Sequence, residues 1–213
     1  MIKKNLPTLI ITSIIILLPV LAGIVLWDRL PEVIAIHFGV NGEPDGWSSR
    51  SVVVFGIPCI MLAVQWLCML GTNADPKRDR ISPKMMKLVL WIIPIIACVT
   101  MTLIYSEVLA YPLKMSTVMP VLIGVLFIII GNYLPKCRQS YTMGIKLPWT
   151  LEDEDNWNRT HRMAGKLWVI CGVAFIIAAF LRIDWLIIAI FVVMILAPTA
   201  YSYMLHVRKS REN

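Results

Sequence analysis

The sequence predicts an all-α integral membrane protein with six transmembrane helices, both termini in the cytoplasm, and a structured extracellular loop between helices 1 and 2. Three observations support this fold class. Of the 213 residues, 58% are hydrophobic and 15% are charged, and the mean hydropathy is +0.75, which is too apolar for a water-soluble surface. The apolar residues are concentrated in six long stretches. The basic residues are distributed unevenly between the intervening loops.

A transmembrane helix needs about 20 mostly apolar residues, because each residue adds about 1.5 Å along the axis and the hydrocarbon core is about 30 Å thick. Continuous apolar stretches predict helices rather than barrel strands, in which apolar and polar residues alternate. Only a few residues separate the last two stretches. There Arg182 and Asp184 predict a tight hairpin at the membrane surface, because a charge at the bilayer centre costs at least about 2.5 kcal/mol. The six predicted spans are 6–27, 52–71, 88–109, 117–134, 164–181 and 183–205.

The distribution of lysine and arginine predicts the orientation. Sixteen of the 20 basic residues fall on the side of the two termini, and four fall on the opposite side. The positive-inside rule therefore places both termini in the cytoplasm and predicts a multi-pass protein of the cell membrane. The net charge of +7 is explained by this bias and by contact with lipid, so no direct nucleic-acid binding is expected.

We expect one polytopic membrane domain over residues 1–213. Its N-terminal half, 1–110, contains the outer loop 28–51, and its second half, 111–213, contains the cytoplasmic loop 135–166. The five cysteines lie mostly inside predicted spans and show no metal-type spacing, so we expect them to be small core residues and expect no metal or cofactor.

The outer loop has the pattern of a β-hairpin. Residues 33–38 are β-prone, and Asn41-Gly42 is a strong signal for a tight turn. A hairpin would bring His37 near Glu43 and Asp45.

In this loop Trp47 could anchor the returning chain at the headgroup level. Because histidine titrates near neutral pH, His37 is a candidate pH sensor or a ligand for a metal or a peptide. The alternative is a loop that only caps the helical bundle, with His37 hydrogen-bonded inside it. At the outer end of the third span, Glu107 would either bind a cationic group or reach the headgroup region near Tyr105 and Tyr111.

The long inner loop predicts a second structured segment. Thr150 followed by Asp153 resembles a capping box, so a helix should begin there. At helical spacing, Trp157 and His161 share one face of this helix, which feeds into the fifth span. This face would serve either as an aromatic and basic belt at the membrane surface or as a docking surface for a soluble partner.

The segment MGIKLPWTLEDEDNWNRTHRMAGKLW, here called the inner motif, resembles the signature of the SdpI family of bacterial immunity proteins. The outer-loop residues LP and NGEPDGW resemble the domain of unknown function that forms the N-terminal half of the same family. The positions that match the family signature are Gly144, Ile145, Lys146, Pro148, Trp149, Thr150, Leu151, Trp157, Thr160, His161 and Arg162.

The resemblance implies a membrane immunity protein that confers resistance to a secreted antimicrobial peptide toxin. It also implies a signal transducer that recruits a cytoplasmic transcriptional repressor to the membrane. On this reading two sets of residues act on opposite faces of the membrane. Toxin sensing would involve His37, Glu43, Asp45, Trp47 and Glu107. Partner docking would involve Trp149, Trp157, Thr160, His161 and Arg162.

Other classes of function stay open at this point, namely a small membrane transporter, a membrane-embedded enzyme, or an assembly factor for another membrane protein. Transporters and intramembrane enzymes usually place ionisable groups near the middle of the bilayer, and none of the spans does so clearly. Nucleophile and metalloprotease motifs such as G-x-S-x-G and H-E-x-x-H are absent from the sequence, so we predict that the chain is not an enzyme.

Overall fold

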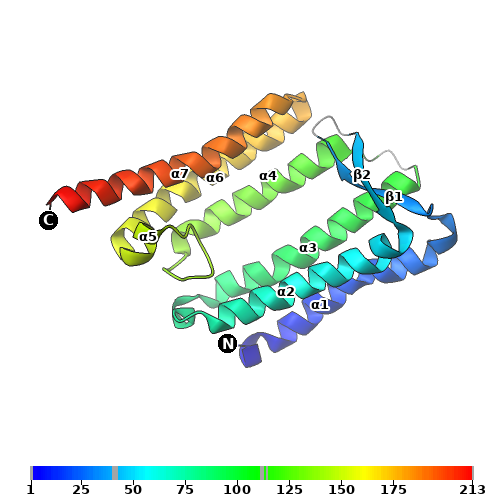
Figure 1. Ribbon diagram of the computed structural model, residues 1–213, viewed down its shortest axis with the longest axis horizontal. Coiled ribbons are helices and arrows are strands. Elements are labelled where there is room, and N and C mark those ends of the chain that lie inside the picture. The colour runs from blue at the N-terminus through cyan, green and yellow to red at the C-terminus, as the bar shows by residue number, and fades with distance from the viewer. Residues whose placement is uncertain (1, 40–42, 111–112, 114, 213) are drawn as a thin grey trace. The chain divides into compact units, whose positions relative to one another are not determined.

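Six helices in the described part of the chain are long and apolar enough to cross a membrane, which confirms the predicted all-α membrane fold (Figure 1). The predicted Asn41-Gly42 turn and Tyr111 lie outside the described residues. The computed structural model describes residues 2–39, 43–110, 113 and 115–212.

The chain folds as two compact units. The first contains residues 1–74 and 83–116, and the second contains residues 75–82 and 117–213. The short segment 75–82 therefore packs with the second unit, although along the chain it connects two helices of the first.

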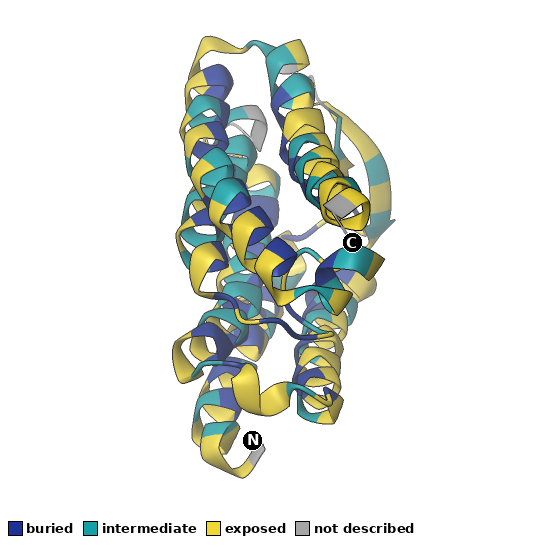
Figure 2. Ribbon diagram, turned by 90° about the vertical axis from the view of Figure 1, so that its left-hand side faces the viewer, coloured by how far each residue is buried: buried dark blue, intermediate teal, exposed yellow. Residues whose placement is uncertain are grey.

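In the first unit, three long helices pack together: α1 (Ile2–Val25), α2 (Ile57–Ala74) and α3 (Pro83–Val108). A wider helical turn at Val52–Gly56 precedes α2 and completes the second span. Buried and exposed residues alternate along the helices (Figure 2), and many of the exposed residues are large and apolar, which is the pattern expected where lipid surrounds a helix.

A proline explains the close fit of α1 against α3. Pro19 has no N–H, so the carbonyl of Ile15 lacks its usual helical partner, and the Cys98 thiol donates to that carbonyl oxygen at 3.4 Å. The Tyr105 hydroxyl donates to the Pro19 carbonyl at 3.1 Å. Gly23 permits this approach, because a Cβ at that position would lie 2.4 Å from the Tyr105 oxygen. The Ile15 and Pro19 carbonyls at this helix contact thus both accept a hydrogen bond from a side chain of α3.

The outer loop forms the predicted hairpin. Strands β1 (Val33–Phe38) and β2 (Pro44–Ser49) pair antiparallel, with His37 opposite Gly46 and Ala35 opposite Trp47. The register is irregular next to His37.

The base of the hairpin is fixed to the first unit. Leu30 and Ile34 are buried in a core cluster with residues of α3 and of the turn before α2. The Arg50 guanidinium donates to the carbonyls of Trp27 at 2.8 Å and of Leu30 at 3.0 Å, and it lies 4.4 Å above the Trp27 ring. The position of the hairpin is therefore set by packing at its base.

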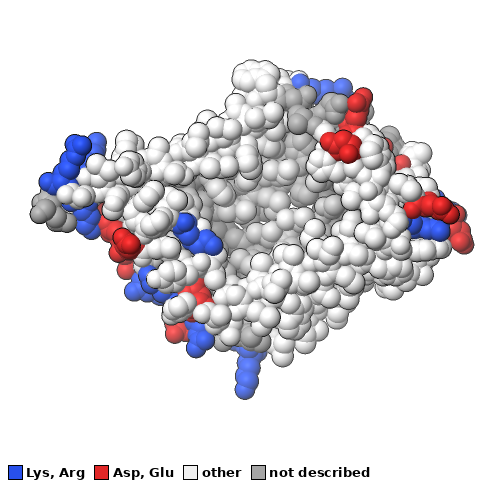
Figure 3. Space-filling view, in the orientation of Figure 1, with Lys and Arg blue, Asp and Glu red and all other residues white. Residues whose placement is uncertain are grey.

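The second unit contains α4 (Met115–Tyr133), α5 (Pro148–Glu152), α6 (Glu154–Leu181) and α7 (Asp184–Glu212). Arg182, in the left-handed conformation, ends α6, so the predicted tight hairpin between the last two spans is present. Helix α7 runs past the predicted end of its span and carries the basic C-terminal residues. Figure 3 shows the charged side chains gathered towards helix ends.

Two pairs of glycines let α4 and α6 approach each other closely. A Cβ at Gly131 would lie 2.9 Å from the Gly165 carbonyl oxygen, and a Cβ at Gly124 would lie 2.8 Å from the Gly172 carbonyl oxygen. Small residues at such crossings allow backbone contact in membrane helices, where no hydrophobic effect drives association. The contact between these two helices therefore depends on the absence of side chains at four positions.

One prediction about the inner loop was wrong in detail. A single helix was expected to begin near Thr150, but Thr150 belongs to the short helix α5, and α6 begins at Glu154. Asp153 separates the two helices and caps α6, because its carboxylate accepts a hydrogen bond from the Asp155 N–H at 3.0 Å.

Candidate functional site in the inner loop

The inner motif is built around a stacked pair of rings. Trp157 and His161 lie one turn apart on α6, and their ring centroids are 4.1 Å apart. His161 Nδ1 donates to the Trp157 carbonyl at 2.8 Å, and His161 Nε2 accepts from the Ile145 N–H at 2.9 Å. One ring nitrogen donates and the other accepts, so the imidazole is neutral in this arrangement.

The chain before α5 wraps over these rings. Gly144 has φ 108°, a left-handed conformation that favours glycine, and a Cβ there would lie 2.5 Å from His161 Nε2. Thr150 then fixes the turn into α5, because its Oγ1 accepts from the Leu147 N–H at 2.9 Å and donates to the Ile145 carbonyl at 2.9 Å. The loop conformation is thus determined by the same residues that define the motif.

A second set of hydrogen bonds joins the motif to α7. The Trp149 indole donates to Ser202 Oγ at 2.9 Å, and the Asn156 amide donates to the Ser202 carbonyl at 2.9 Å. Thr160 Oγ1 donates to the side-chain oxygen of Asn156, Oδ1, at 3.0 Å. The Trp149 ring also stacks on His206. Residues from three helices therefore form one hydrogen-bonded cluster.

Asp75 holds the connecting segment 75–82 against this loop. One carboxylate oxygen accepts from the N–H groups of Tyr141 and Thr142, each at 2.9 Å, and from the Thr142 hydroxyl at 2.7 Å. The other oxygen accepts from the Lys77 N–H at 2.8 Å. Asp75 is buried; burial acts to raise its pKa, but these hydrogen bonds together outweigh it, so the pKa lies below its usual value.

Gln139 continues this connection. Its side-chain amide donates to the carbonyls of Thr150 and Leu151, each at 2.9 Å, and its carbonyl oxygen accepts from Lys77 Nζ. At the edge of the segment, Arg80 forms an exposed ion pair with Glu154 at 3.1 Å. Residues 75–82 are thereby part of the inner site, which the sequence analysis did not identify.

The predicted docking residues do not share one environment. Trp157, Thr160 and His161 are almost completely buried, with at most 1% of each exposed. Trp149 is half-buried and Arg162 is exposed. In this structure only Arg162 and part of Trp149 are placed to touch a partner, and the other three hold the loop in shape. Their docking role stays a prediction.

The predicted sensing residues lie on the outer hairpin, with one exception. His37 Nδ1 forms a short hydrogen bond with a carboxylate oxygen of Asp45, as the hairpin predicted, and Glu43 is also exposed near the turn. The Trp47 side chain is 58% exposed. Glu107 lies near the end of α3 and is exposed, and no hydrogen bond joins it to the hairpin among the described residues.

Within the described residues, no group of three or more histidine, cysteine, aspartate or glutamate side chains is arranged to hold a metal ion. Cys137, just after the fourth span, is buried, and burial raises the pKa of its thiol to about 11. This thiol is therefore protonated at neutral pH, and its position suits packing.

Comparison with known proteins supports both parts of the resemblance. Residues 136–202 match the model of the SdpI/YfhL protein family, and residues 14–62 match that of a domain of unknown function, DUF1648. The chain is similar to the immunity protein SdpI of Bacillus subtilis (strain 168), with 29% identity over 92% of this chain and 90% of the relative. No solved structure matches the chain significantly.

Proposed function

We propose that the chain, which matches the SdpI/YfhL family model over residues 136–202 and is similar to an immunity protein, is a membrane immunity protein that confers resistance to a secreted antimicrobial peptide. The observation that carries this proposal is the similarity to an immunity protein over nearly the full length of both chains. The six spans and the multi-pass membrane location agree with it, since a membrane-active peptide meets its target in the bilayer.

The outer hairpin is the proposed site of peptide sensing. It combines an exposed aromatic ring, Trp47, with the exposed pair His37 and Asp45, so it offers apolar contact and hydrogen bonding together. The hairpin base is fixed by Arg50, which would allow a peptide bound at the tip to act on the helices below. Glu107 would add a carboxylate for a cationic group on the peptide.

Signalling through a cytoplasmic repressor is the finer part of the proposal. The docking surface would be the loop that Trp157, Thr160 and His161 hold in shape, with Arg162 and Trp149 among the side chains that reach the partner. Segment 75–82 connects the end of α2 to the start of α3. A movement of either helix would therefore reach this loop through Asp75. Only a peptide that binds one arrangement better than the other would shift the loop.

The chain is proposed to act without catalysing a reaction. Transport of the peptide or of an ion, or an assembly role for another membrane protein, would be the competing activities. Liposomes that contain the purified full chain would show flux of the protective peptide or of ions if transport were the mechanism. If this flux were fast enough to account for the protection, a transport function would replace the proposal that the chain protects by binding the peptide.

The direct experiment is survival of a sensitive Gram-positive strain, with and without the chain, across doses of several secreted membrane-active peptides. Protection against one peptide at an unchanged dose response to the others is the expected result. Trp47→Ala should lose this protection, while Val33→Thr, at an equally exposed hairpin position, should keep it. Equal survival with and without the chain for every peptide, at confirmed membrane levels, would contradict the proposal.

A further inference from the structure

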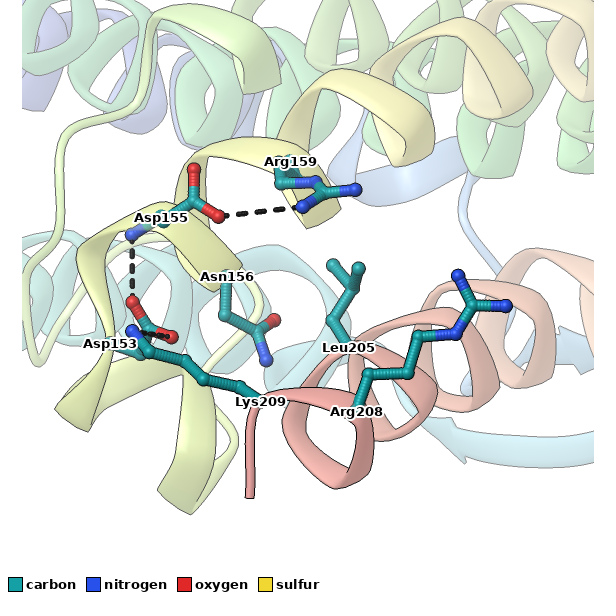
Figure 4. Close-up of a pocket in the computed structure, with 7 residues that line it drawn as sticks. All are labelled: Asp153, Asp155, Asn156, Arg159, Leu205, Arg208 and Lys209. Atoms are coloured by element: carbon teal, nitrogen blue, oxygen red, sulfur yellow. Dashed lines mark hydrogen bonds and ion pairs between the residues drawn. The ribbon is translucent and has the colours of Figure 1, made fainter. Parts of the chain in front are cut away.

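A polar pocket of about 350 Å³ lies between the start of α6 and the end of α7 (Figure 4). Both helices are membrane spans, so the pocket is placed where they leave the bilayer. Its volume is large enough for a small polar headgroup. The pocket does not include the stacked Trp157 and His161 rings, although Asn156 belongs both to its lining and to the hydrogen-bonded cluster of the inner motif. It is lined by Asp153, Asp155, Asn156, Arg159, Leu205, Arg208 and Lys209.

The two carboxylates in the pocket already have partners. Asp153 accepts from Lys209 Nζ at 2.9 Å and from the Asp155 N–H, and Asp155 lies 3.6 Å from the Arg159 guanidinium. The Lys209 hydrogen bond is the main reason that the pKa of Asp153 is lowered; burial opposes it. Both acidic residues also lie at the N-terminal end of α6, where the helix dipole favours negative charge. Their charges are therefore largely compensated within the pocket.

The positive charge is not fully compensated. Three basic side chains line the pocket against two carboxylates, and Arg208 has no ion pair or hydrogen bond among the described residues. Figure 4 shows the guanidinium groups of Arg159 and Arg208 extending away from Asp153, with the Leu205 side chain lying between the two arginines. This arrangement leaves a positively charged space bordered by one apolar side chain, Leu205.

We propose that this pocket binds the phosphate of an anionic phospholipid headgroup. Guanidinium groups donate two parallel hydrogen bonds to phosphate oxygens, so Arg159 and Arg208 would hold the phosphate from two sides. Leu205 would contact the glycerol part of the lipid. The occupant is assigned to lipid because Tyr203 and Met204, just before the pocket on α7, are each 53% exposed on a membrane span. Basic pockets between spans are known to suit such headgroups.

The test measures lipid binding to the delipidated full chain in detergent by native mass spectrometry. Phosphatidylglycerol and phosphatidylcholine with the same acyl chains are titrated separately, and phosphatidylglycerol should bind more tightly. Arg208→Gln and Arg159→Gln should each weaken phosphatidylglycerol binding about fivefold, the effect of one basic residue at a membrane surface. Arg211→Gln is the matched control, because Arg211 lies on the same helix end but outside the pocket.

Three outcomes would overturn the proposal. Equal weakening by Arg211→Gln would show diffuse surface charge. Unchanged phosphatidylglycerol affinity in both pocket variants would show that the lipid does not bind in this pocket, and the alternative ligand would be an acidic side chain of a protein partner. Saturable binding of inorganic phosphate, with no preference between the two lipids, would indicate a site for free phosphate.

Thermal unfolding of each variant checks that the fold is intact. Because this readout is lipid binding, its failure is distinct from a failure of immunity.

Discussion

The outer hairpin and the inner motif use similar side chains in opposite ways. In the hairpin, His37 and Asp45 pair on an exposed surface, and Trp47 is 58% exposed. In the inner motif, Trp157 and His161 are buried, and both ring nitrogens of His161 have partners. The comparison shows that Trp157 and His161 maintain the fold of the inner loop, whereas His37, Asp45 and Trp47 remain exposed on the hairpin.

The largest expected effect is that of Trp157→Ala. The change removes a fully buried ring and the indole hydrogen bond to the Cys137 carbonyl, so it should lower the free energy of unfolding by about 3–5 kcal/mol. Denaturant unfolding in detergent would measure it. Trp185→Ala is the control, because that side chain is 71% exposed. Similar unfolding midpoints for the two variants would mean that the inner motif is not the packed core described above.

The glycine contact between α4 and α6 gives the next effect. Gly131→Ala places a Cβ within 3.0 Å of backbone atoms of α6, and overpacking of this kind typically costs about 1–3 kcal/mol. Gly71→Ala is the matched control, since a Cβ there meets nothing within 4 Å. It should be neutral or stabilise α2 by up to about 1 kcal/mol. Thermal unfolding of both variants tests the difference, and equal destabilisation would refute the close crossing.

Asp75→Asn should lower the free energy of unfolding by about 2 kcal/mol at neutral pH, because several hydrogen bonds to a charged carboxylate are weakened. The pKa of Asp75 is lowered in the folded state, so its stabilisation is present above the ordinary aspartate pKa and lost as the pH falls through the folded value. Wild type and variant should therefore converge in acid. Asp79→Asn, at an exposed position in the same segment, should show little effect at any pH. If the free energies of unfolding of wild type and Asp75→Asn differed by the same amount from neutral to acidic pH, this role for Asp75 would be contradicted.

His37→Gln should have the smallest effect on stability, below about 1 kcal/mol, because exposed ion pairs contribute little. If the hairpin senses the peptide, the same change should still reduce protection. Dose–survival curves, normalised to the amount of protein in the membrane, separate the two quantities. Full protection by His37→Gln would show that the His37–Asp45 pair is not part of the sensing surface.

Much of the fold could be predicted from the sequence, because the length of an apolar stretch is a local signal. The predicted spans correspond to the six long helices, and the β-prone segment before Asn41-Gly42 predicted the hairpin and its His37–Asp45 contact.

The inner site could be predicted only in part. The spacing of Trp157 and His161 correctly indicated a shared helix face, but spacing does not tell a buried face from a docking face. The partners Asp75 and Ser202 lie far from the motif in sequence, so no local pattern pointed to them. An aspartate placed directly after a membrane span, at Asp75, was the one available signal, because an ionisable group there needs partners.

The most direct test of the contrast between the two regions is protection per molecule in the membrane, measured for Trp47→Ala and Trp157→Ala side by side. Trp47→Ala is expected to reach normal membrane levels and to lose protection per molecule. Trp157→Ala is expected to lower the amount of folded protein, and the molecules that remain should still protect. The reverse pattern, with full protection per molecule from Trp47→Ala and normal levels of an inactive Trp157→Ala, would contradict the account.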